Sequence, residues 1–278
     1  MTLETSLPIA THASTVKRWL SGSRVGTEIG AFESPVPGIT PIYVDRFSEY
    51  AGKPCRADYW GDACALPFRS HSLDYVVTSH VLEHVANPVA ALLEWHRVLR
   101  SGGVIYMVVP DRRFTFDHPR HPTSPEHMWA DFEQSATQRD GSHIDDFVNG
   151  VDWSQFSPDT PPEQIEHARN TLAEQYRSAI AQQQEINIHF HVFESGNLRG
   201  LVELVAQRKR LAWEVLASNE RFPTDCPNGI LMVIRIRKFG REALISQWNA
   251  WRARFNRNWV VSPEAKPLSS DAEMRQTH

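Results

Sequence analysis

The sequence predicts an α/β protein with a doubly wound, mostly parallel, seven-stranded sheet and an inserted cap. The first observation is the run 73–110, which reads as strand, helix, Gly-Gly turn and strand. The second is a set of shorter apolar runs, each of which stops at an aspartate or a glycine. The third is a change of pattern after residue 110, where prolines, histidines and aromatic residues interrupt the alternation of strands and helices.

The run 73–110 is the clearest unit. Residues 73–78 are apolar and rich in β-branched side chains, as a buried strand requires. Pro88 suits the first turn of a helix, and apolar residues then recur at helical spacing up to the Gly102-Gly103 turn. Residues 104–109 form a second continuous apolar strand. Two parallel strands joined by a helix make a right-handed unit, and ligands bind beyond the carboxyl ends of such strands.

Shorter patterns predict the remaining elements. We expect strands over 25–29, 42–44 and 58–60 before this unit and over 188–193, 213–216 and 230–236 after it, with helices over 14–22, 163–184, 195–207 and 241–259. Turn residues in 223–229 predict that the last two strands form a hairpin. We expect the basic, aromatic helix 241–259 to pack its aromatic face on the domain or on a partner subunit, although a membrane surface or RNA would also suit it.

Composition excludes several classes of protein. The chain has 278 residues, 41% of them hydrophobic, and a net charge of −4, which disfavours a dedicated nucleic-acid partner. No apolar run approaches the ~18 residues of a membrane span, and the N-terminal residues lack a secretory signal. Three cysteines without metal spacing indicate free thiols in a reducing compartment. We expect a cytoplasmic protein, with a homo-oligomer left open.

Two segments carry a family resemblance. The run SHVLEHVANPVAALLEWHRVLRSGG (79–103) resembles the fourth-strand to fifth-strand segment of class I S-adenosylmethionine-dependent methyltransferases, in particular the small-molecule group. The run PDRRFTFDHPR (110–120) resembles a subgroup that is associated with polysaccharide and glycan biosynthesis. The resemblance implies a Rossmann-like methyltransferase fold, S-adenosylmethionine as cofactor, and methyl transfer as the activity.

The resemblance and the residue pattern together divide the chain into regions. The resemblance implies a cofactor-binding half of the methyltransferase domain over 1–110, and the change of pattern after residue 110 predicts a cap over the substrate pocket at 111–184. The rest of the sheet follows at 185–238, then an amphipathic helix at 239–261 and a polar, disordered tail at 262–278.

The first two strands supply part of the implied cofactor site. Glu28 and Gly30 stand where the family has its acidic-x-glycine turn, in which glycine lets the backbone pass close to the ligand and the acid acts indirectly on the methionine amino group. Asp45 ends the second strand, where a carboxylate can accept both ribose hydroxyls. The loop EIGAFESPVPG lacks the usual glycines, so we expect it to adopt another shape and do not transfer contacts to Phe32 or Glu33.

The third and fourth strands supply the rest. Asp62 matches the family's acidic residue near the adenine amino group, and the backbone amide of Ala63 could meet the adenine ring. Ser79 and His80 would line the floor near the methionine end. Glu83 and His84 are interpreted as packing residues rather than catalysts.

A hydroxyl acceptor needs a general base, and histidine is suited to that role near neutral pH. His189 and His191 alternate along INIHFHVF, so in a strand both would face the same side. His143, from the cap, is a third candidate. Asp111, which leaves the strand at the ligand end of the sheet, is the fourth.

These observations favour transfer of a methyl group from S-adenosylmethionine to an oxygen of a small molecule or glycan, with a histidine as general base. Nitrogen as the acceptor atom stays open. One alternative is a non-catalytic binding or scaffold protein on a degenerate methyltransferase fold, which the altered EIGAFESP loop motivates. The other is a metal-dependent enzyme that uses the histidine cluster. No local spacing of Cys, His and carboxylates supports a metal strongly, so none is predicted.

Overall fold

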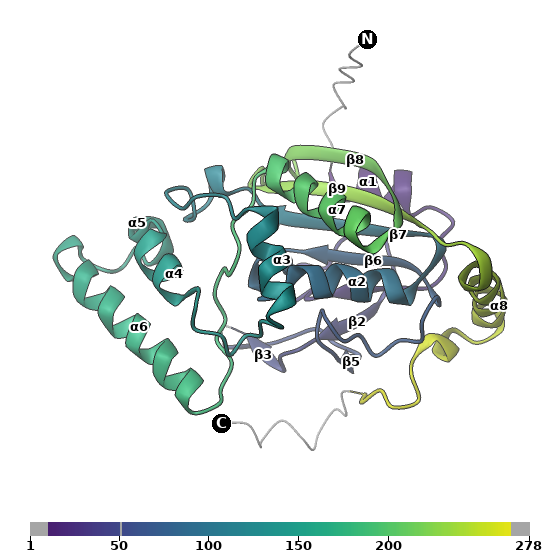
Figure 1. Cartoon of the computed structure of the whole chain (residues 1–278), viewed down its shortest axis with the longest axis horizontal. Helices are drawn as coiled ribbons and strands as arrows, with labels where there is room; N and C mark the ends of the chain where they lie inside the picture. The colour runs from purple at the N-terminus through teal and green to yellow at the C-terminus, as the bar shows by residue number, and fades with distance from the viewer. Residues whose placement is uncertain (1–10, 51, 268–278) are drawn as a thin grey trace, which may run out of the picture.

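The computed structural model describes residues 11–50 and 52–267, and its centre is one seven-stranded sheet (Figure 1). The strands lie in the order β5-β2-β1-β6-β7-β9-β8. Their bounds are β1 Gly26–Ile29, β2 Ile42–Asp45, β5 Tyr59–Trp60, β6 Leu73–Ser79, β7 Leu99–Pro110, β8 Ala212–Phe222 and β9 Gly229–Arg237. The first five pair in parallel, whereas β9 runs antiparallel to both β7 and β8. The predicted fold class and final hairpin are confirmed.

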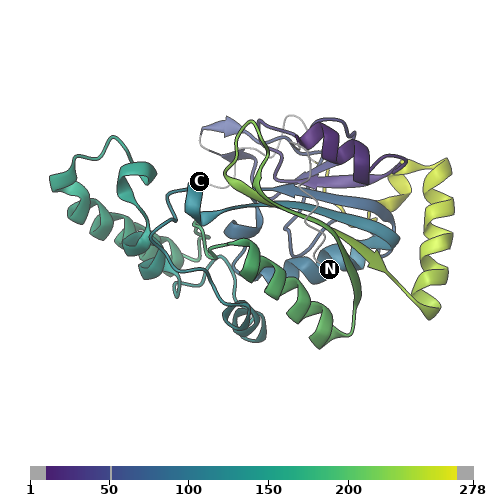
Figure 2. The same ribbon diagram turned by 90° about the horizontal axis from the view of Figure 1, so that it is seen from above.

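Helices cover both faces of the sheet, as Figure 2 shows. Helix α1 (His12–Trp19) packs on one face, and α2 (Pro88–Val98), α3 (Pro125–Glu133) and α7 (Ser195–Lys209) pack on the other. Helix α8 (Gly240–Phe255) lies at the end of the sheet opposite the cap (Figures 1 and 2). A small ribbon of β3 (Glu49–Tyr50) and β4 (Lys53–Pro54) stands apart from the main sheet.

Helix α2 connects the core to the loop that follows β5. The side chain of Asn87 accepts a hydrogen bond from the N–H of Ala90, and Pro88 occupies the first turn, so both fix the start of the helix. Trp95 is fully buried, and its Nε1 donates to the carbonyl oxygen of Ala63 at 3.0 Å. This bond attaches the loop after β5 to the rigid core.

The cap has its own hydrophobic core. Helices α4 (Ile144–Gly150), α5 (Trp153–Phe156) and α6 (Ile165–Ala181) pack around buried side chains such as Phe147 and Trp153. In both views these helices lie beyond the edge of the sheet at which β7 ends (Figures 1 and 2). Short 3₁₀ turns connect the elements: η1 Leu82–His84, η2 Arg112–Phe114, η3 Pro162–Gln164 and η4 Arg257–Val260.

The strand that we predicted over 188–193 is wrong. The segment is buried but irregular, and its backbone bonds to turns and side chains rather than to a sheet. The N–H of Phe190 donates to the Glu83 carbonyl at 2.8 Å, and the N–H of Val192 donates to Thr123 Oγ1 at 3.0 Å. Burial between the cap and the sheet explains the apolar run, which is why it resembles a buried strand.

Two boundary predictions also change. Helix α1 covers His12–Trp19 with Thr11 as its N-cap, whereas the predicted helix covered 14–22. The Gly102-Gly103 pair lies inside β7, because the helix ends at Val98 and the strand begins at the next residue.

The chain after α8 returns to the sheet. The N–H of Ser262 donates to the Pro67 carbonyl at 2.9 Å, and the N–H of Trp60 donates to the Lys266 carbonyl at 3.2 Å. Residues 262–267 of the predicted tail therefore pack along the β5 edge, and the rest of that tail lies outside the described residues.

The aromatic face of α8 is exposed in the chain as described. Trp248 and Phe255 are 54% and 77% exposed, so the expected packing of this face on the domain does not occur, and packing on a partner subunit stays a prediction. No helix within 11–50 and 52–267 is long and apolar enough to cross a membrane.

One glycine of β1 is required by close packing, which gives a stability prediction. A Cβ at Gly26 would lie 2.4–2.5 Å from ring atoms of buried Tyr75. Gly26→Ala is therefore expected to lower the free energy of unfolding by about 1–3 kcal/mol, measured by urea denaturation. Gly196→Ala in α7 is the matched control, since a Cβ there meets nothing within 4 Å. Equal stability of the two variants would contradict the prediction.

Candidate active site

A cavity of about 370 Å³ lies at the carboxyl ends of the parallel strands. It is built from the segments that follow β1, β2, β5 and β6, with Gln138, Ile186 and Asn187 closing it from the cap side. Its volume is in the range of small-molecule sites. The lining includes all seven residues that the resemblance assigned to the cofactor: Glu28, Gly30, Asp45, Asp62, Ala63, Ser79 and His80.

Glu28, the buried acid of β1, shapes the loop that follows it. Its Oε1 accepts the N–H of Val36 at 2.8 Å, which holds the far end of the loop. Its Oε2 is buried and has no hydrogen-bond partner among the described residues. Burial raises the pKa of Glu28 to about 7, so the carboxyl changes charge near neutral pH. One acceptor atom is thus available beside the cavity.

The glycine-poor loop EIGAFESPVPG contains two residues with left-handed backbone conformation that line the cavity, Gly30 and Phe32. Gly30 has a φ of +66°, and a Cβ there would lie 2.6 Å from Val81 Cγ2. Phe32 has a φ of +43°, which is uncommon for a bulky residue, and its ring meets Tyr50 edge-on at 5.4 Å between centroids. Both rings line the cavity. The loop therefore has the altered shape that the sequence indicated, with an aromatic wall in place of the missing glycines.

Asp45 sits at the end of β2, where its Oδ1 accepts the N–H of Phe47 at 2.9 Å. Burial raises the pKa of this carboxyl. The thiol of Cys55 stands beside it, and burial raises the pKa of Cys55 to about 12, so this cavity-lining cysteine stays protonated. The bond to Phe47 orients the carboxylate of Asp45, which also accepts a hydrogen bond from the Cys55 thiol.

Asp62, after β5, is held by two contacts. Its Oδ1 accepts the N–H of Cys64 at 2.6 Å, and its Oδ2 pairs with Arg46 at 2.6 Å. Arg46 also pairs with Glu185, which lies beyond the cap. Arg46 lines the cavity and links Asp62 to the segment that leaves the cap. Sequence reasoning did not single it out, because the link depends on a contact 139 residues away in the chain.

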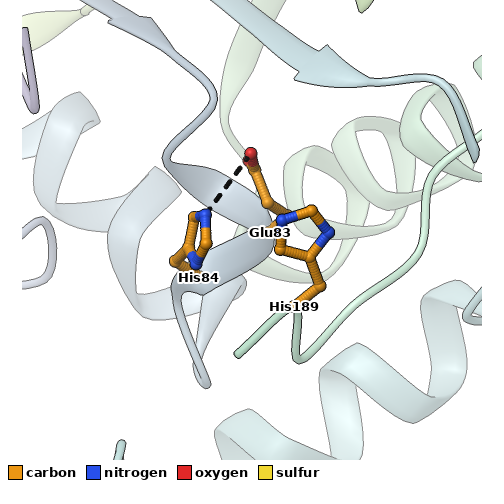
Figure 3. Close-up of side chains that lie close together, drawn as sticks. All are labelled: Glu83, His84 and His189. Atoms are coloured by element: carbon orange, nitrogen blue, oxygen red, sulfur yellow. Dashed lines mark ion pairs between the residues drawn. The ribbon is translucent and has the colours of Figure 1, made fainter. Parts of the chain in front are cut away.

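His80 and His84 line the cavity, and Glu83, which lies between them in the chain, is fully buried. Figure 3 shows Glu83 and His84 together with His189. His80 Nδ1 and His84 Nε2 lie 3.6 Å and 3.8 Å from Glu83 Oε1. Neither carboxyl oxygen of Glu83 has a hydrogen-bond partner in the described part of the chain, and burial raises the pKa of Glu83 to about 8. Burial lowers the pKa of His80 to about 4 and that of His84 to about 3, so both rings are neutral at pH 7.

The four residues predicted as candidates for the base do not line this cavity, although all lie within the described residues. His189 contacts a residue that does line it: its ring meets that of His84 at 4.6 Å between centroids (Figure 3). Its Nδ1 lies 2.5 Å from Asp117 Oδ2. Asp111 is buried, and both its oxygens accept from Arg113, at 2.8 Å from Nε and 2.5 Å from the terminal nitrogen.

His191 and His143 belong to a second cluster, together with His127 and Asp131. The rings of His143 and His191 lie 5.2 Å apart between centroids, and the Nε2 of His191 bonds to the carbonyl of Ala86 at 3.3 Å. His189 and His191 therefore do not share a face. The expectation that they would was wrong, because the segment is not extended as a strand.

A family model matches part of the sequence, and the fold agrees with that match. Residues 44–107 match the family model of a methyltransferase domain. The sheet order, its one antiparallel strand beside β7 and the cavity at the strand ends are those of a Rossmann-like methyltransferase fold. Residues 44–107 thus match a methyltransferase domain, in a chain whose fold is Rossmann-like.

Curated relatives match only short segments. An uncharacterized 37.1 kDa protein in a transposon of Streptomyces fradiae is 47% identical over 60 residues, 21% of this chain and 17% of that protein. Demethylmenaquinone methyltransferase of Staphylococcus epidermidis is 47% identical over 45 residues, 16% of this chain and 19% of that protein. The chain thus matches less than a fifth of the length of these relatives.

Solved structures align over more of the chain at low identity. A methyltransferase from Methanosarcina mazei aligns with 81% of this chain and 98% of its own, at 13% identity and a TM-score of 0.42. A protein from Pyrococcus horikoshii aligns with 82% of this chain and 88% of its own, at 14% identity and a TM-score of 0.43.

Proposed function

We propose that the protein transfers a methyl group from S-adenosylmethionine to an oxygen of a small molecule or glycan. The observation that carries the proposal is the convergence of the seven residues assigned to the cofactor on one cavity, from four different strands. Methyl transfer is an in-line displacement at a carbon that the sulfonium already activates. The protein's task is to align the acceptor and to remove its proton.

The chemistry of the lining supports a role for each part of the cofactor. The carboxylate of Asp45 is an acceptor for the ribose hydroxyls, and Asp62 with the amide of Ala63 would meet the adenine. The unpartnered Oε2 of Glu28 suits the methionine ammonium, with Ser79 toward the same end.

The proposal is tested by calorimetry with S-adenosylmethionine, followed by a transfer assay with labelled cofactor and candidate acceptors. We expect binding in the micromolar range. A protein that binds no cofactor at high micromolar concentration would instead be the scaffold that the altered EIGAFESP loop suggested.

Ionisation of Glu28 gives a pH prediction. Because burial raises its pKa to about 7, the carboxylate that attracts the ammonium is a minor form at pH 5.5 and about half the population at pH 7. Cofactor affinity is expected to rise roughly 10-fold between about pH 5.5 and 7. The amino group of the cofactor stays charged over this interval, because an α-amino group titrates at higher pH. Glu28→Gln should flatten the profile, and an unchanged slope in calorimetry would contradict the assignment.

Folding stability should respond in the opposite direction. A carboxyl whose pKa is raised in the folded state favours folding most fully below its ordinary pKa of 4.5, and that contribution is lost as the pH rises through about 7. A rise in affinity toward pH 7 would therefore not reflect a more stable protein.

We place the general base at His84. It lines the cavity, whereas His189 meets it from behind and is itself held by Asp117. A base needs an open approach to the acceptor. Of the two histidines that line the cavity, His80 is assigned to the methionine end of the cofactor, which leaves His84 for the acceptor. His189 then acts as a positioning residue, and its carboxylate partner keeps the imidazole oriented. His143, His191 and Asp111 remain the alternatives from the sequence prediction.

The glycan preference rests on the resemblance of 110–120. In the fold, three arginines of this segment form ion pairs within the protein: Arg112 with Glu194, Arg113 with Asp111, and Arg120 with Asp117. Its contribution is to anchor the cap on the β7 end of the sheet. An acceptor screen should therefore include small-molecule alcohols as well as sugars. The relative named a demethylmenaquinone methyltransferase adds a quinol to that screen.

A further inference from the structure

A cluster of histidines lies in the cap, away from the residues proposed for methyl transfer. Helix α3 supplies His127 and Asp131, which are four residues apart and so lie on one face of the helix. The N-cap of α4 supplies His143, and the irregular segment 186–194 supplies His191. Asp131, His143 and His191 are buried, while the side chain of His127 is 53% exposed.

The spacing of the polar atoms is that of ligands around one ion. Nε2 of His127 lies 3.1 Å from Nε2 of His143, and these nitrogens lie 3.5 Å and 3.7 Å from Asp131 Oδ2. Four ligands at about 2.0–2.1 Å from a tetrahedral zinc ion are roughly 3.3 Å apart. The three observed separations scatter around that value. Three protein ligands with an exposed side match a site that keeps one coordination position open.

Hydrogen bonding within the protein does not account for the arrangement. Two imidazole Nε2 atoms face each other, and only one of them can donate to the other. Asp131 Oδ2 is buried without a hydrogen-bond partner among the described residues, although a buried carboxylate oxygen is costly unless it is satisfied. Ser142 Oγ lies 2.9 Å from His143 Nδ1 and can accept its proton, which leaves Nε2 with a lone pair toward the cluster.

We propose that His127, Asp131 and His143 bind a divalent transition-metal ion, with zinc as the best fit. Two imidazoles and one carboxylate form a borderline donor set of the kind that such ions prefer. His191 lies beside the ligands, with its Nε2 3.8 Å from Asp131 Oδ2. The binding does not depend on the proposed methyl transfer.

The site would also fix one wall of the cavity. The loop between Asp131 and His143 contains Gln138, which lines the cavity and accepts the N–H of Ile186 at 2.8 Å. His191 bonds to Ala86, next to the cavity-lining Val85. An ion that joins α3 to α4 would therefore order the wall of the cavity that Gln138 contributes.

The test uses the full chain without a histidine tag, treated with chelator, desalted and titrated with ZnCl₂ alone. We expect one equivalent bound at micromolar concentration or tighter, with Tm raised by about 5 °C. Cobalt in place of zinc should give the visible absorption bands of a tetrahedral site. Absence of zinc binding at 10-fold molar excess, by calorimetry and by metal analysis after gel filtration, would overturn the proposal.

Variants locate the ion. His127→Ala, at an exposed position, and Asp131→Asn, which keeps size and shape, are expected to weaken zinc binding at least about 100-fold while the circular dichroism spectrum is unchanged. His121→Ala, an exposed histidine of the same region, should bind zinc normally. Stoichiometric zinc binding that survives both ligand variants but is lost in His84→Ala or His189→Ala would assign the ion to the Glu83 group instead and refute this site.

Discussion

Replacement of His84 by alanine is expected to lower the turnover of methyl transfer by about 10²–10⁴-fold at saturating cofactor. The physical reason is that an alcohol is a poor nucleophile until its proton leaves, and His84 is a neutral imidazole on the cavity wall. Its Nε2 lies 3.8 Å from Glu83 Oε1, with the ring of His189 behind it. Burial raises the pKa of Glu83 to about 8, so this carboxyl stabilises the imidazolium only when it loses its own proton.

The matched control for this variant is His121→Ala, which removes an exposed histidine outside the cavity lining and should leave turnover unchanged. His189→Ala should lower turnover less and shift the pH profile, since it alters the environment of His84 rather than the reacting atoms. Near-normal turnover in His84→Ala, together with a large loss in a His143, His191 or Asp111 variant, would move the base to the residues that the sequence suggested.

Asp45→Ala is expected to weaken binding of S-adenosylmethionine about 10-fold or more. A hydrogen bond to a charged group contributes roughly 1.5–3 kcal/mol, and Asp45 presents an oriented carboxylate at the end of β2. Isothermal titration of the variant measures the change directly. Asp58→Ala is the control, because it removes a carboxylate that bonds to Tyr43 beside the same strand without lining the cavity. Unchanged affinity in Asp45→Ala would remove the ribose assignment.

Much of the fold follows from local pattern. The strands β1, β2 and β5 overlap short runs that stop at Gly or Asp, and β6, β7 and β9 overlap continuous apolar runs. The helices α2, α6 and α7 follow periodic apolar residues. The residues assigned to the cofactor lie at or just after the carboxyl ends of four strands, so their convergence is a consequence of parallel pairing. This is why they could be identified without any tertiary contact.

The substrate side depends on contacts that no local pattern reveals. Segment 188–193 has the composition of a strand, yet its N–H groups bond to a 3₁₀ turn and a threonine side chain. Asp111 is positioned like a ligand residue, but Arg113, two residues later, occupies both its oxygens. Glu83 and His84 looked like packing residues because the LEH run is also part of the fold. Only the three-dimensional arrangement separates these roles.

His189 and His191 are separated by a single residue, yet one contacts the wall of the cavity and the other contacts the histidines of the cap. Their Cα atoms can be no more than about 7 Å apart. Only two peptide units separate the two histidines in the chain. Phe190 lies between them, and its N–H donates to the carbonyl of Glu83, the residue before His84. The same short segment therefore contacts both the cap cluster and the turn that carries His84.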